Sequence, residues 1–212
     1  MPEPAVRIVR VPFTESQIAA VARMHVSEVS DGFLSSLGEP VLRLLYRQVA
    51  VSRHCALLLA QSDRGETLGY ICGTRDTSAL YREFLRSRWR VAVRMLAPRL
   101  LSPKRILRAL ETLRYPTSAD AALPKAEIIN FVVLPYVRGR GVATLLFEEL
   151  MQWFHAQGDT TVKIVTGEHQ VRAHHFYRKS GAVLHGRTSV HRGTRSLVYL
   201  RPVDAPAPHP PS

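Results

Sequence analysis

The segment that most constrains the fold is an apolar strand followed by a glycine-containing turn and a helix. Residues Glu127–Leu134 have the composition of a buried strand, which ends before Pro135. The turn Arg138-Gly139-Arg140-Gly141 then leads directly into Val142–Ala156, whose apolar residues recur at helical spacing until Gly158. Strand–turn–helix units of this kind build layered α/β sheets, so we expect this chain to contain one.

The rest of the chain extends this pattern in both directions. Further strands are expected at Val6–Val11, Ala56–Gln61, Thr67–Thr74, Val162–Val165, Ala182–His185 and Ser196–Arg201. Helices are expected at Glu15–Val29, after Pro40 and at Gln170–Lys179. Antiparallel-looking strands come first, and strands that alternate with helices follow. The chain is therefore predicted to be α/β, with a single mixed, mostly antiparallel twisted sheet flanked by helices.

The first helix has a recognisable start. Thr14 followed three residues later by Gln17 is a capping box, in which each residue satisfies a backbone N–H near the helix N-terminus. The apolar stripe of this helix is expected to consist of Ile18, Val21, Ala22 and Val26.

Positive charge is concentrated in one segment. The 212 residues include 29 Lys and Arg against 17 Asp and Glu, a net charge of +12. Ser78–Arg114 holds ten basic and two acidic residues, which is +8 of that excess. A helical projection places four arginines on one face of the segment: Arg82, Arg86, Arg90 and Arg94. A second helix is expected at Ile106–Leu113, so residues 78–116 are interpreted as a basic helical insertion that faces an anionic partner or solvent.

Composition also excludes several classes of protein. The two cysteines, Cys55 and Cys72, lie in apolar runs and predict buried reduced thiols rather than a disulfide framework or a metal site. No apolar run approaches the roughly 20 residues of a membrane span, and Met1–Arg10 lacks the apolar core of a secretory signal. A cytoplasmic protein is expected. Residues 1–203 are interpreted as one domain and residues 204–212 as a Pro-rich disordered tail.

The turn before Val142–Ala156 has the chemistry of an anion site. The N–H groups in the first turn of a helix lack intrahelical partners, and the helix dipole favours negative charge there. Gly139 and Gly141 would let phosphate oxygens approach the backbone, while Arg138 and Arg140 add positive charge. The patterns Gly-x-Gly-x-x-Gly and Gly-Lys-Ser/Thr of other nucleotide-binding loops are absent from the sequence.

Two stretches resemble the GCN5-related N-acetyltransferase (GNAT) superfamily. In Arg138–Ala143, three residues match the acetyl-CoA loop Arg/Gln-x-x-Gly-x-Gly/Ala, namely Arg138, Gly141 and Ala143. The stretch Gln170–Ala182 is similar to the later family segment Asn-x-x-Ala-x-x-Phe-Tyr-x-x-x-Gly-Phe, with Gln in place of the first Asn and Ala in place of the last aromatic residue. The resemblance covers about Val6–Arg201, with the basic insertion as extra material.

The resemblance implies acetyl-CoA as co-substrate and no metal. The amide arm of acetyl-CoA would pair with the strand Phe131-Val132-Val133, and its pyrophosphate would lie on the turn Arg138–Ala143. Gln170 could donate a hydrogen bond to the pantetheine arm. The residues implied to bind acetyl-CoA are Phe131, Val132, Val133, Arg138, Gly139, Arg140, Gly141, Val142, Ala143, Gln170, Ala173 and Tyr177.

The resemblance also implies catalytic roles. Tyr177 would protonate the departing thiolate, or it is only a core aromatic beside Phe176. Glu127 would be the general base, or it is only a solvated carboxylate at a strand end. The Val133 N–H would bind the oxyanion, which requires a strand irregularity at that residue. Three histidines are expected on exposed faces rather than at a metal: His169, His174 and His175.

The function implied is transfer of acetyl from acetyl-CoA to a primary amine by direct attack, with His25 as an acceptor contact. The acceptor considered first is a phosphate-bearing small molecule such as a nucleotide-linked amino sugar. A longer acyl chain, a hydroxyl acceptor, and an acyl-CoA-binding, nucleic-acid-binding or membrane-surface protein without turnover are the alternatives. Nucleic acid is disfavoured because stacking aromatics do not alternate with the basic residues. An anionic membrane surface and a homodimer stay open.

Overall fold

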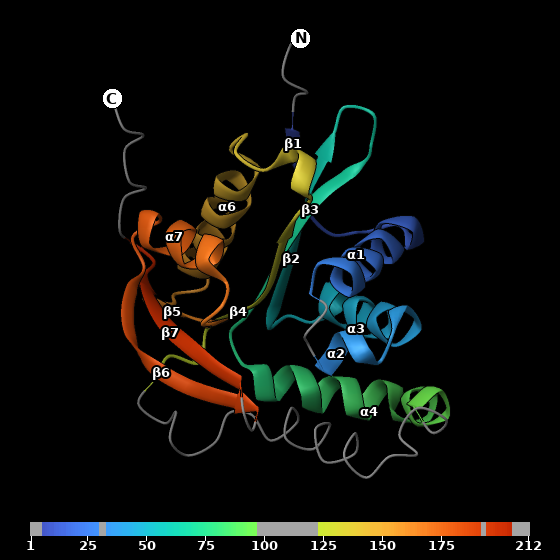
Figure 1. The fold of residues 1–212 in the computed structure, drawn as a ribbon. Coiled ribbons are helices and arrows are strands. Elements are labelled where there is room, and N and C mark those ends of the chain that lie inside the picture. The colour runs from blue at the N-terminus through green and yellow to red at the C-terminus, as the bar shows by residue number, and fades with distance from the viewer. Residues whose placement is uncertain (1–5, 30–32, 97–122, 192–193, 205–212) are drawn as a thin grey trace.

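The computed structural model describes residues 6–29, 33–96, 123–191 and 194–204. These residues contain a seven-stranded sheet in the order β1-β2-β3-β4-β5-β7-β6 (Figure 1). The strands are β1 (Val6–Val9), β2 (Cys55–Ser62), β3 (Thr67–Thr74), β4 (Glu127–Val133), β5 (Thr161–Gly167), β6 (Val183–His191) and β7 (Thr194–Pro202). Neighbouring strands are antiparallel except β4 and β5, which confirms the predicted mixed sheet.

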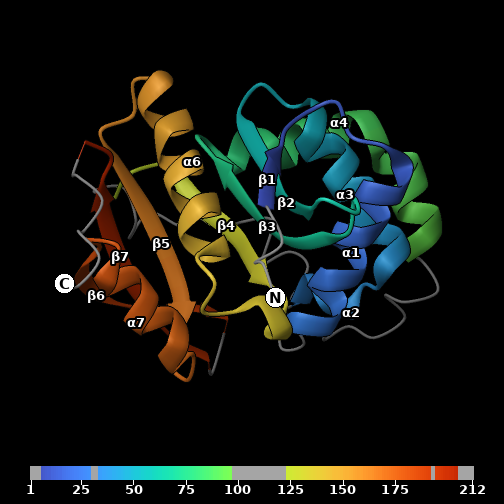
Figure 2. The same cartoon turned by 90° about the horizontal axis from the view of Figure 1, so that it is seen from above.

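Helices cover both faces of this sheet. They are α1 (Glu15–Glu28), α2 (Phe33–Ser36), α3 (Glu39–Val51), α4 (Thr77–Leu96), α6 (Val142–Ala156) and α7 (Val171–Lys179), with a short 3-10 turn, η2 (Pro135–Val137), before α6. Viewed from above, α1 to α4 lie on one side of the central strands and α6 on the other (Figure 2). The central strands β2 and β3 are therefore buried on both faces, with every residue buried except Thr67.

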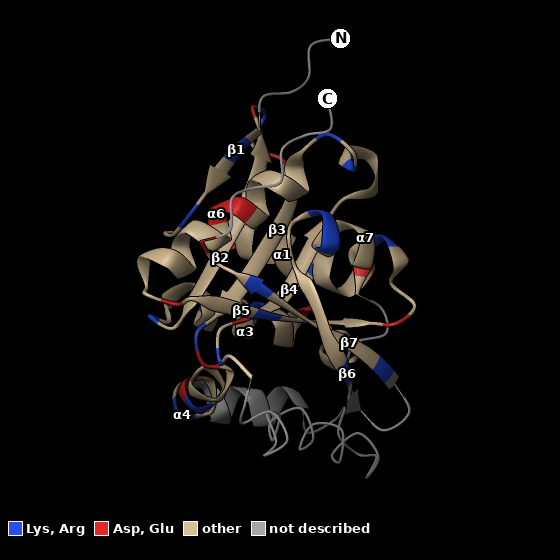
Figure 3. Ribbon diagram, turned by 90° about the vertical axis from the view of Figure 1, so that its left-hand side faces the viewer, with Lys and Arg blue, Asp and Glu red and all other residues tan. Residues whose placement is uncertain are grey.

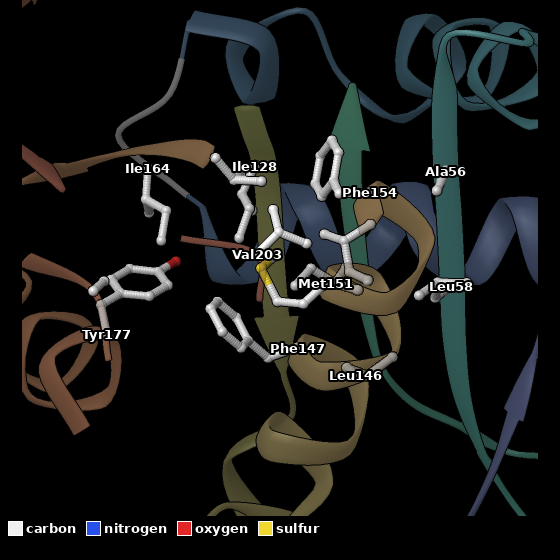
Figure 4. Packing of buried hydrophobic residues seen from close by; sticks show 14 of the residues in the cluster. Ala56, Leu58, Ile128, Leu146, Phe147, Met151, Phe154, Ile164, Tyr177 and Val203 are labelled. Atoms are coloured by element: carbon white, nitrogen blue, oxygen red, sulfur yellow. The ribbon is translucent and has the colours of Figure 1, made fainter. Parts of the chain in front are cut away.

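One hydrophobic core lies between α6 and the sheet. Figure 4 shows Phe147 and Phe154 of α6 among side chains from the strands, with Tyr177 of α7 at the edge of the same cluster. A Cβ at Gly73 of β3 would lie 2.8 Å from Cζ of Phe154, so glycine allows α6 to pack closely on this strand. The close contact fixes the position of α6 relative to β3.

The second core lies under α1, α3 and α4 and contains one correction to the sequence analysis. The capping box at Thr14 is present, but Val26 is 36% exposed and does not belong to the apolar stripe. His25 is buried in its place, with Nδ1 2.7 Å from the hydroxyl of Tyr46. Residues 18, 21, 22 and 25 lie on one face of a helix, and a polar residue is tolerated there because the Tyr46 hydroxyl bonds to its ring.

The basic segment begins as predicted. The backbone is helical through α4, and Leu80 and Phe84 are buried in the second core. Arg82 and Arg86 are exposed, and basic positions are marked on α4 in Figure 3. The side chains of residues 88–96, and therefore Arg90 and Arg94, lie outside the described part, as do residues 97–122 with the expected second helix and residues 205–212 of the expected tail.

Other expectations hold with small changes. Cys55 and Cys72 are free and buried, as predicted. The short helix α2 was not predicted, and β6 extends to His191 rather than ending at His185. β6 is longer than its apolar pattern because its polar residues also pair with β7, for example Arg187 with Leu197 and Thr188 with Ser196. Backbone pairing of this kind does not require apolar side chains. None of the described helices is both long and apolar enough to cross a bilayer.

Candidate active site

The sheet opens between β4 and β5. These two strands are paired only at their first residues, Glu127 with Lys163 and Ile128 with Ile164. Beyond these pairs, β4 continues to Val133 beside β3, while β5 continues beside β7. The second half of β4 thus has a neighbouring strand on one side only, which is where the sequence analysis expected the cofactor strand.

The backbone of β4 presents hydrogen-bonding groups to this opening. The Leu134 amide donates to the Leu68 carbonyl of β3 at 3.0 Å. Bonded and non-bonded pairs alternate along an antiparallel ladder, so Phe131 and Val133 direct their own N–H and C=O groups away from β3. Consistent with this direction, Arg138 Nε donates to the Val133 carbonyl at 2.9 Å.

The strand irregularity lies elsewhere than expected. In β4 the register shifts between the pairs Cys72–Asn130 and Gly73–Ile128, so Ile129 is the extra residue rather than Val133. The expectation of an irregularity at Val133 is therefore wrong. The Val133 amide faces the opening because β5 has diverged, and a regular strand is sufficient for that.

The glycine turn has the conformation of an anion cradle. Gly139 and Gly141 have φ values of 80° and 77°, a region that favours glycine, and a Cβ at either position would meet open space. The first helical hydrogen bond of α6 runs from the Leu145 amide to the Gly141 carbonyl, at 3.0 Å. The amides of residues 142–144 therefore have no acceptor within the helix and can bind a ligand. A chain of free amides beside open space fits the phosphates of a nucleotide.

A cleft of about 530 Å³ joins these elements. It brings together eight residues implied by the family resemblance: Phe131, Val132, Val133, Arg138, Ala143, Gln170, Ala173 and Tyr177. The other four, Gly139, Arg140, Gly141 and Val142, belong to the turn between Arg138 and Ala143 rather than to the cleft lining. Thr166 donates to Gln170 Oε1 at 2.6 Å, so the amide NH₂ of Gln170 remains for a ligand.

Comparison with known proteins gives this arrangement a family. Residues 25–182 match the family model described as Acetyltransferase (GNAT) family. The chain belongs to the GNAT acetyltransferase family. It is an acyltransferase that uses acetyl-CoA as co-substrate, as the resemblance implied.

Solved structures share the fold at low sequence identity. The structure titled SsHAT is 20% identical, with a TM-score of 0.65 over 96% of this chain and 100% of that one. Ard1 from Thermoplasma volcanium is 15% identical, with a TM-score of 0.59 over 93% and 97%. A GNAT-family acetyltransferase from Staphylococcus aureus is 13% identical, with a TM-score of 0.59 over 94% and 100%. No curated protein matches the sequence significantly.

The GNAT cleft contains an ion pair that sequence reasoning missed. Glu28, at the end of α1, lines the cleft, and its Oε2 accepts a hydrogen bond from Arg138 Nη2 at 2.7 Å. The two residues are 110 positions apart, and no sequence signal connects them. Arg138 is thus held by a carboxylate where the family resemblance implies a pyrophosphate.

We expect Glu28→Gln to increase affinity for CoA about 2- to 10-fold at low salt, because it removes a carboxylate that repels phosphate and occupies Arg138. Calorimetric titration with CoA measures this. Glu149→Gln is the matched control. Glu149 lies on α6 outside the cleft lining and pairs with Arg10, and its side chain is 24% exposed, as is that of Glu28. Equal affinity gains in both variants would mean that only net charge matters.

Tyr177 lies between the core and the cleft. It is 7% exposed, packs near Phe147 and Phe176 with ring centroids 6.3 Å and 5.6 Å away, and also lines the 530 Å³ cleft. In Figure 4 its ring extends from α7 toward Ile164 of β5. Burial raises the pKa of Tyr177 well above its usual value, so the phenol keeps its proton.

Glu127 is placed differently from the alternative considered in the sequence analysis. It is 6% exposed rather than solvated, and its Oε2 lies 3.3 Å from Lys163 Nζ and accepts from Thr77 Oγ1 at 3.3 Å. It lies outside the lining of the cleft that contains Tyr177 and lines a smaller cavity on the α4 side of β4. The structure therefore does not bring Glu127 and Tyr177 into one cavity.

Of the three histidines expected on exposed faces, His169, His174 and His175, one is placed differently. His169 and His175 are exposed as expected, and His169 lines the cleft. His174 is half-buried, with Nδ1 3.1 Å from the Tyr199 hydroxyl and Nε2 3.2 Å from the Glu168 carbonyl. Its two ring nitrogens thus have protein partners. Across the described ranges, no three His, Cys, Asp or Glu side chains gather in a way that would hold a metal ion.

Proposed function

We propose that this GNAT protein transfers acetyl from acetyl-CoA directly to a primary amine. The observation that carries the proposal is the opening beside β4, where the amides of Phe131 and Val133 face a cleft that continues to the glycine turn. A strand edge can pair with the amide groups of a pantetheine arm, and the N-terminus of α6 can hold a pyrophosphate. The positive φ of Gly141 and its open surroundings support the same assignment.

Each catalytic role is assigned to a group of this chain. Bound acetyl-CoA supplies an activated acetyl group as its thioester. The Val133 N–H donates a hydrogen bond where negative charge develops on the acyl oxygen. Tyr177 gives its proton to the departing sulfur as the C–S bond breaks; burial keeps the phenol protonated at neutral pH, so that proton is present when it is needed. No side chain carries the acetyl group in this scheme, so the amine attacks directly.

Glu127 is proposed as the group that takes the amine proton. Its carboxylate is at the base of the β4–β5 opening, on the side of the sheet covered by α1, α3 and α4. A buried carboxylate next to an apolar cavity can receive a proton from an ammonium or amine that enters it. Lys163 and Thr77 hold this carboxylate in one orientation.

The test uses purified protein, acetyl-CoA and a panel of amines and alcohols. We expect a product that carries the acetyl group on nitrogen and resists hydroxylamine, which would cleave an ester. Without an acceptor, the intact protein should gain no acetyl group by mass spectrometry. Acetylation of alcohols alone, or a stable acetyl-enzyme, would contradict the proposal.

The same assay tests Glu127. Glu127→Gln should lower turnover about 100-fold and leave CoA affinity unchanged, in line with the usual contribution of a general base. The change also leaves Lys163 buried without its carboxylate partner, which can cost about 3–5 kcal/mol of folding free energy. Thermal unfolding of the variant is therefore measured in parallel, and wild-type turnover in a folded Glu127→Gln protein would remove Glu127 from this role.

The nature of the acceptor beyond its amine stays a prediction. A phosphate-bearing acceptor was predicted from the basic segment, of which Arg82 and Arg86 are the described exposed members. Arg82 Nη2 lies 4.0 Å from Asp76 Oδ2. Such a solvent-accessible ion pair is weak, so Asp76 would compete only weakly with an anionic acceptor for Arg82. An anionic membrane surface and a homodimer likewise stay predictions.

A further inference from the structure

A small cavity lies beside β4, on the face of the sheet opposite α6. Its volume is about 130 Å³, and its described lining comes from α1, α2, α3, α4 and β4. Most of the wall is apolar, with Leu45 and Val49 from α3, Leu80 from α4 and Ile129 from β4. Ile129 is the extra residue of the β4 irregularity, and Phe131 of the acetyl-CoA cleft follows two positions later. The cavity and the cleft are therefore both bordered by β4.

The size and burial of this cavity limit what can enter it. Val49 and Leu80 are each 1% exposed, so this part of the wall is shielded from solvent, whereas Leu34 and Asn130 are only partly buried. A dry protein cavity of about 150 Å³ binds benzene, which sets the scale for a cavity of this volume. A six-membered ring or a branched chain of similar size fits, and a disaccharide or a nucleotide does not.

Three polar residues of this wall, His25, Tyr46 and Asn130, belong to one hydrogen-bonded chain that runs through Tyr70. His25 Nδ1 lies 2.7 Å from the Tyr46 hydroxyl, which lies 2.9 Å from the Tyr70 hydroxyl. Tyr70 in turn donates to Asn130 Oδ1. Burial lowers the pKa of His25 to about 4, so this end of the chain is neutral near pH 7. Hydroxyl groups of a sugar would lose water here and gain few new partners, a costly exchange.

The described part of the cavity wall has one carboxylate, that of Glu127 on β4, which is also paired with Lys163 at 3.3 Å. Tyr81 of α4 stays neutral because burial and the Glu127 charge raise the pKa of Tyr81 to about 12. Among the described lining residues, Glu127 is the sole Asp or Glu. One amino group therefore finds an anionic partner, whereas the further ammonium groups of a polyamine do not.

We propose that this cavity receives the carbon skeleton of the acceptor, and that the acceptor is a primary amine on a compact apolar group about the size of a benzene ring. The amino group then lies toward β4, next to Glu127 and to the opening between β4 and β5. This inference rests on the proposed amine acetylation and specifies its substrate class. Apolar contact then recognises the carbon skeleton of the acceptor, and the cavity sets no requirement on any part of the acceptor that lies outside it.

The first test ranks acceptors with the wild-type protein. Benzylamine should be acetylated with a kcat/KM about 30- to 100-fold above that of spermidine or glucosamine 6-phosphate, because burying an apolar group of this size contributes about 2–3 kcal/mol. Preference for spermidine or for glucosamine 6-phosphate would overturn the inference and leave the proposed amine acetylation intact. Failure to bind CoA or to acetylate any amine would overturn the proposed function itself.

The second test fills the cavity. Val49→Phe places a ring into it and should raise the KM for benzylamine about 10-fold or more, with CoA affinity unchanged. Val51→Phe is the matched control, since Val51 is the last residue of the same helix and is 75% exposed. Wild-type benzylamine kinetics in a folded Val49→Phe protein would contradict the inference. If that variant does not fold, the wild-type ranking decides alone.

Discussion

Gly141→Asp is expected to raise the Kd for CoA at least about 100-fold, equivalent to about 2.7 kcal/mol, while the protein remains folded. Gly141 has φ of 77°, and a Cβ there meets no atom within 4 Å, so the side chain fits without a clash. A non-glycine residue in the left-handed conformation lowers the free energy of unfolding by about 1–2 kcal/mol, which does not by itself change CoA affinity. The new carboxylate, however, lies at the N-terminus of α6, where it binds the free amides itself and repels a pyrophosphate.

Two variants separate these effects. Gly141→Asn has nearly the same size without the charge, and Asn tolerates the left-handed region, so its loss of affinity should be much smaller. Gly158→Asp repeats the backbone change just past the other end of α6, where φ is 80° and the space is also open, and it should bind CoA as the wild type does. Calorimetry with CoA measures all three. Undiminished affinity in Gly141→Asp would show that the pyrophosphate lies elsewhere.

Tyr177→Phe is expected to lower turnover about 100- to 1000-fold and to change CoA affinity less than twofold. The phenol acts mainly as the thiolate departs, so its loss affects the transition state far more than the bound ground state. Phe keeps the ring that packs near Phe147 and Phe176, so the fold should be unaffected. Because burial raises the Tyr177 pKa above its usual value near 10, we also expect no loss of wild-type turnover from this group as pH rises from 7 to about 9.

Tyr199→Phe provides the control for Tyr177→Phe. Tyr199 lies in the same cluster, with its ring centroid 6.2 Å from that of Tyr177, but its hydroxyl contacts His174 and it does not line the acetyl-CoA cleft. Turnover of this variant should stay close to wild type, with a stability loss of about 1 kcal/mol for the missing hydrogen bond. A Tyr177→Phe enzyme with wild-type turnover, when the chemical step limits the rate, would exclude Tyr177 as the acid.

Local signals in the sequence were enough to predict most helices and strands and the glycine turn before α6. The helix bounds Val142–Ala156 were predicted correctly, because the glycines on either side and the apolar spacing between them act within a few residues of the chain. The Thr14 capping box is a local signal of the same kind. Gly141 was selected on its position before a helix, and its left-handed conformation confirms that a glycine is favoured there.

Only the tertiary structure decided how these elements combine. The divergence of β5 from β4 leaves the Val133 amide facing a cleft. β5 stays beside β7 along its whole length but pairs with β4 only at two residues, and no pattern within β4 encodes this. The contacts of Glu28 with Arg138, of Glu127 with Lys163 and of His25 with Tyr46 join residues from different elements. Caps, periodicity and turns depend on chain neighbours, whereas the burial and partner of a charged or polar side chain depend on which elements the sheet brings together. The sequence therefore determined the family and the glycine turn before α6, and the packing of the sheet determined the ion pair in the cleft and the cavity beside β4.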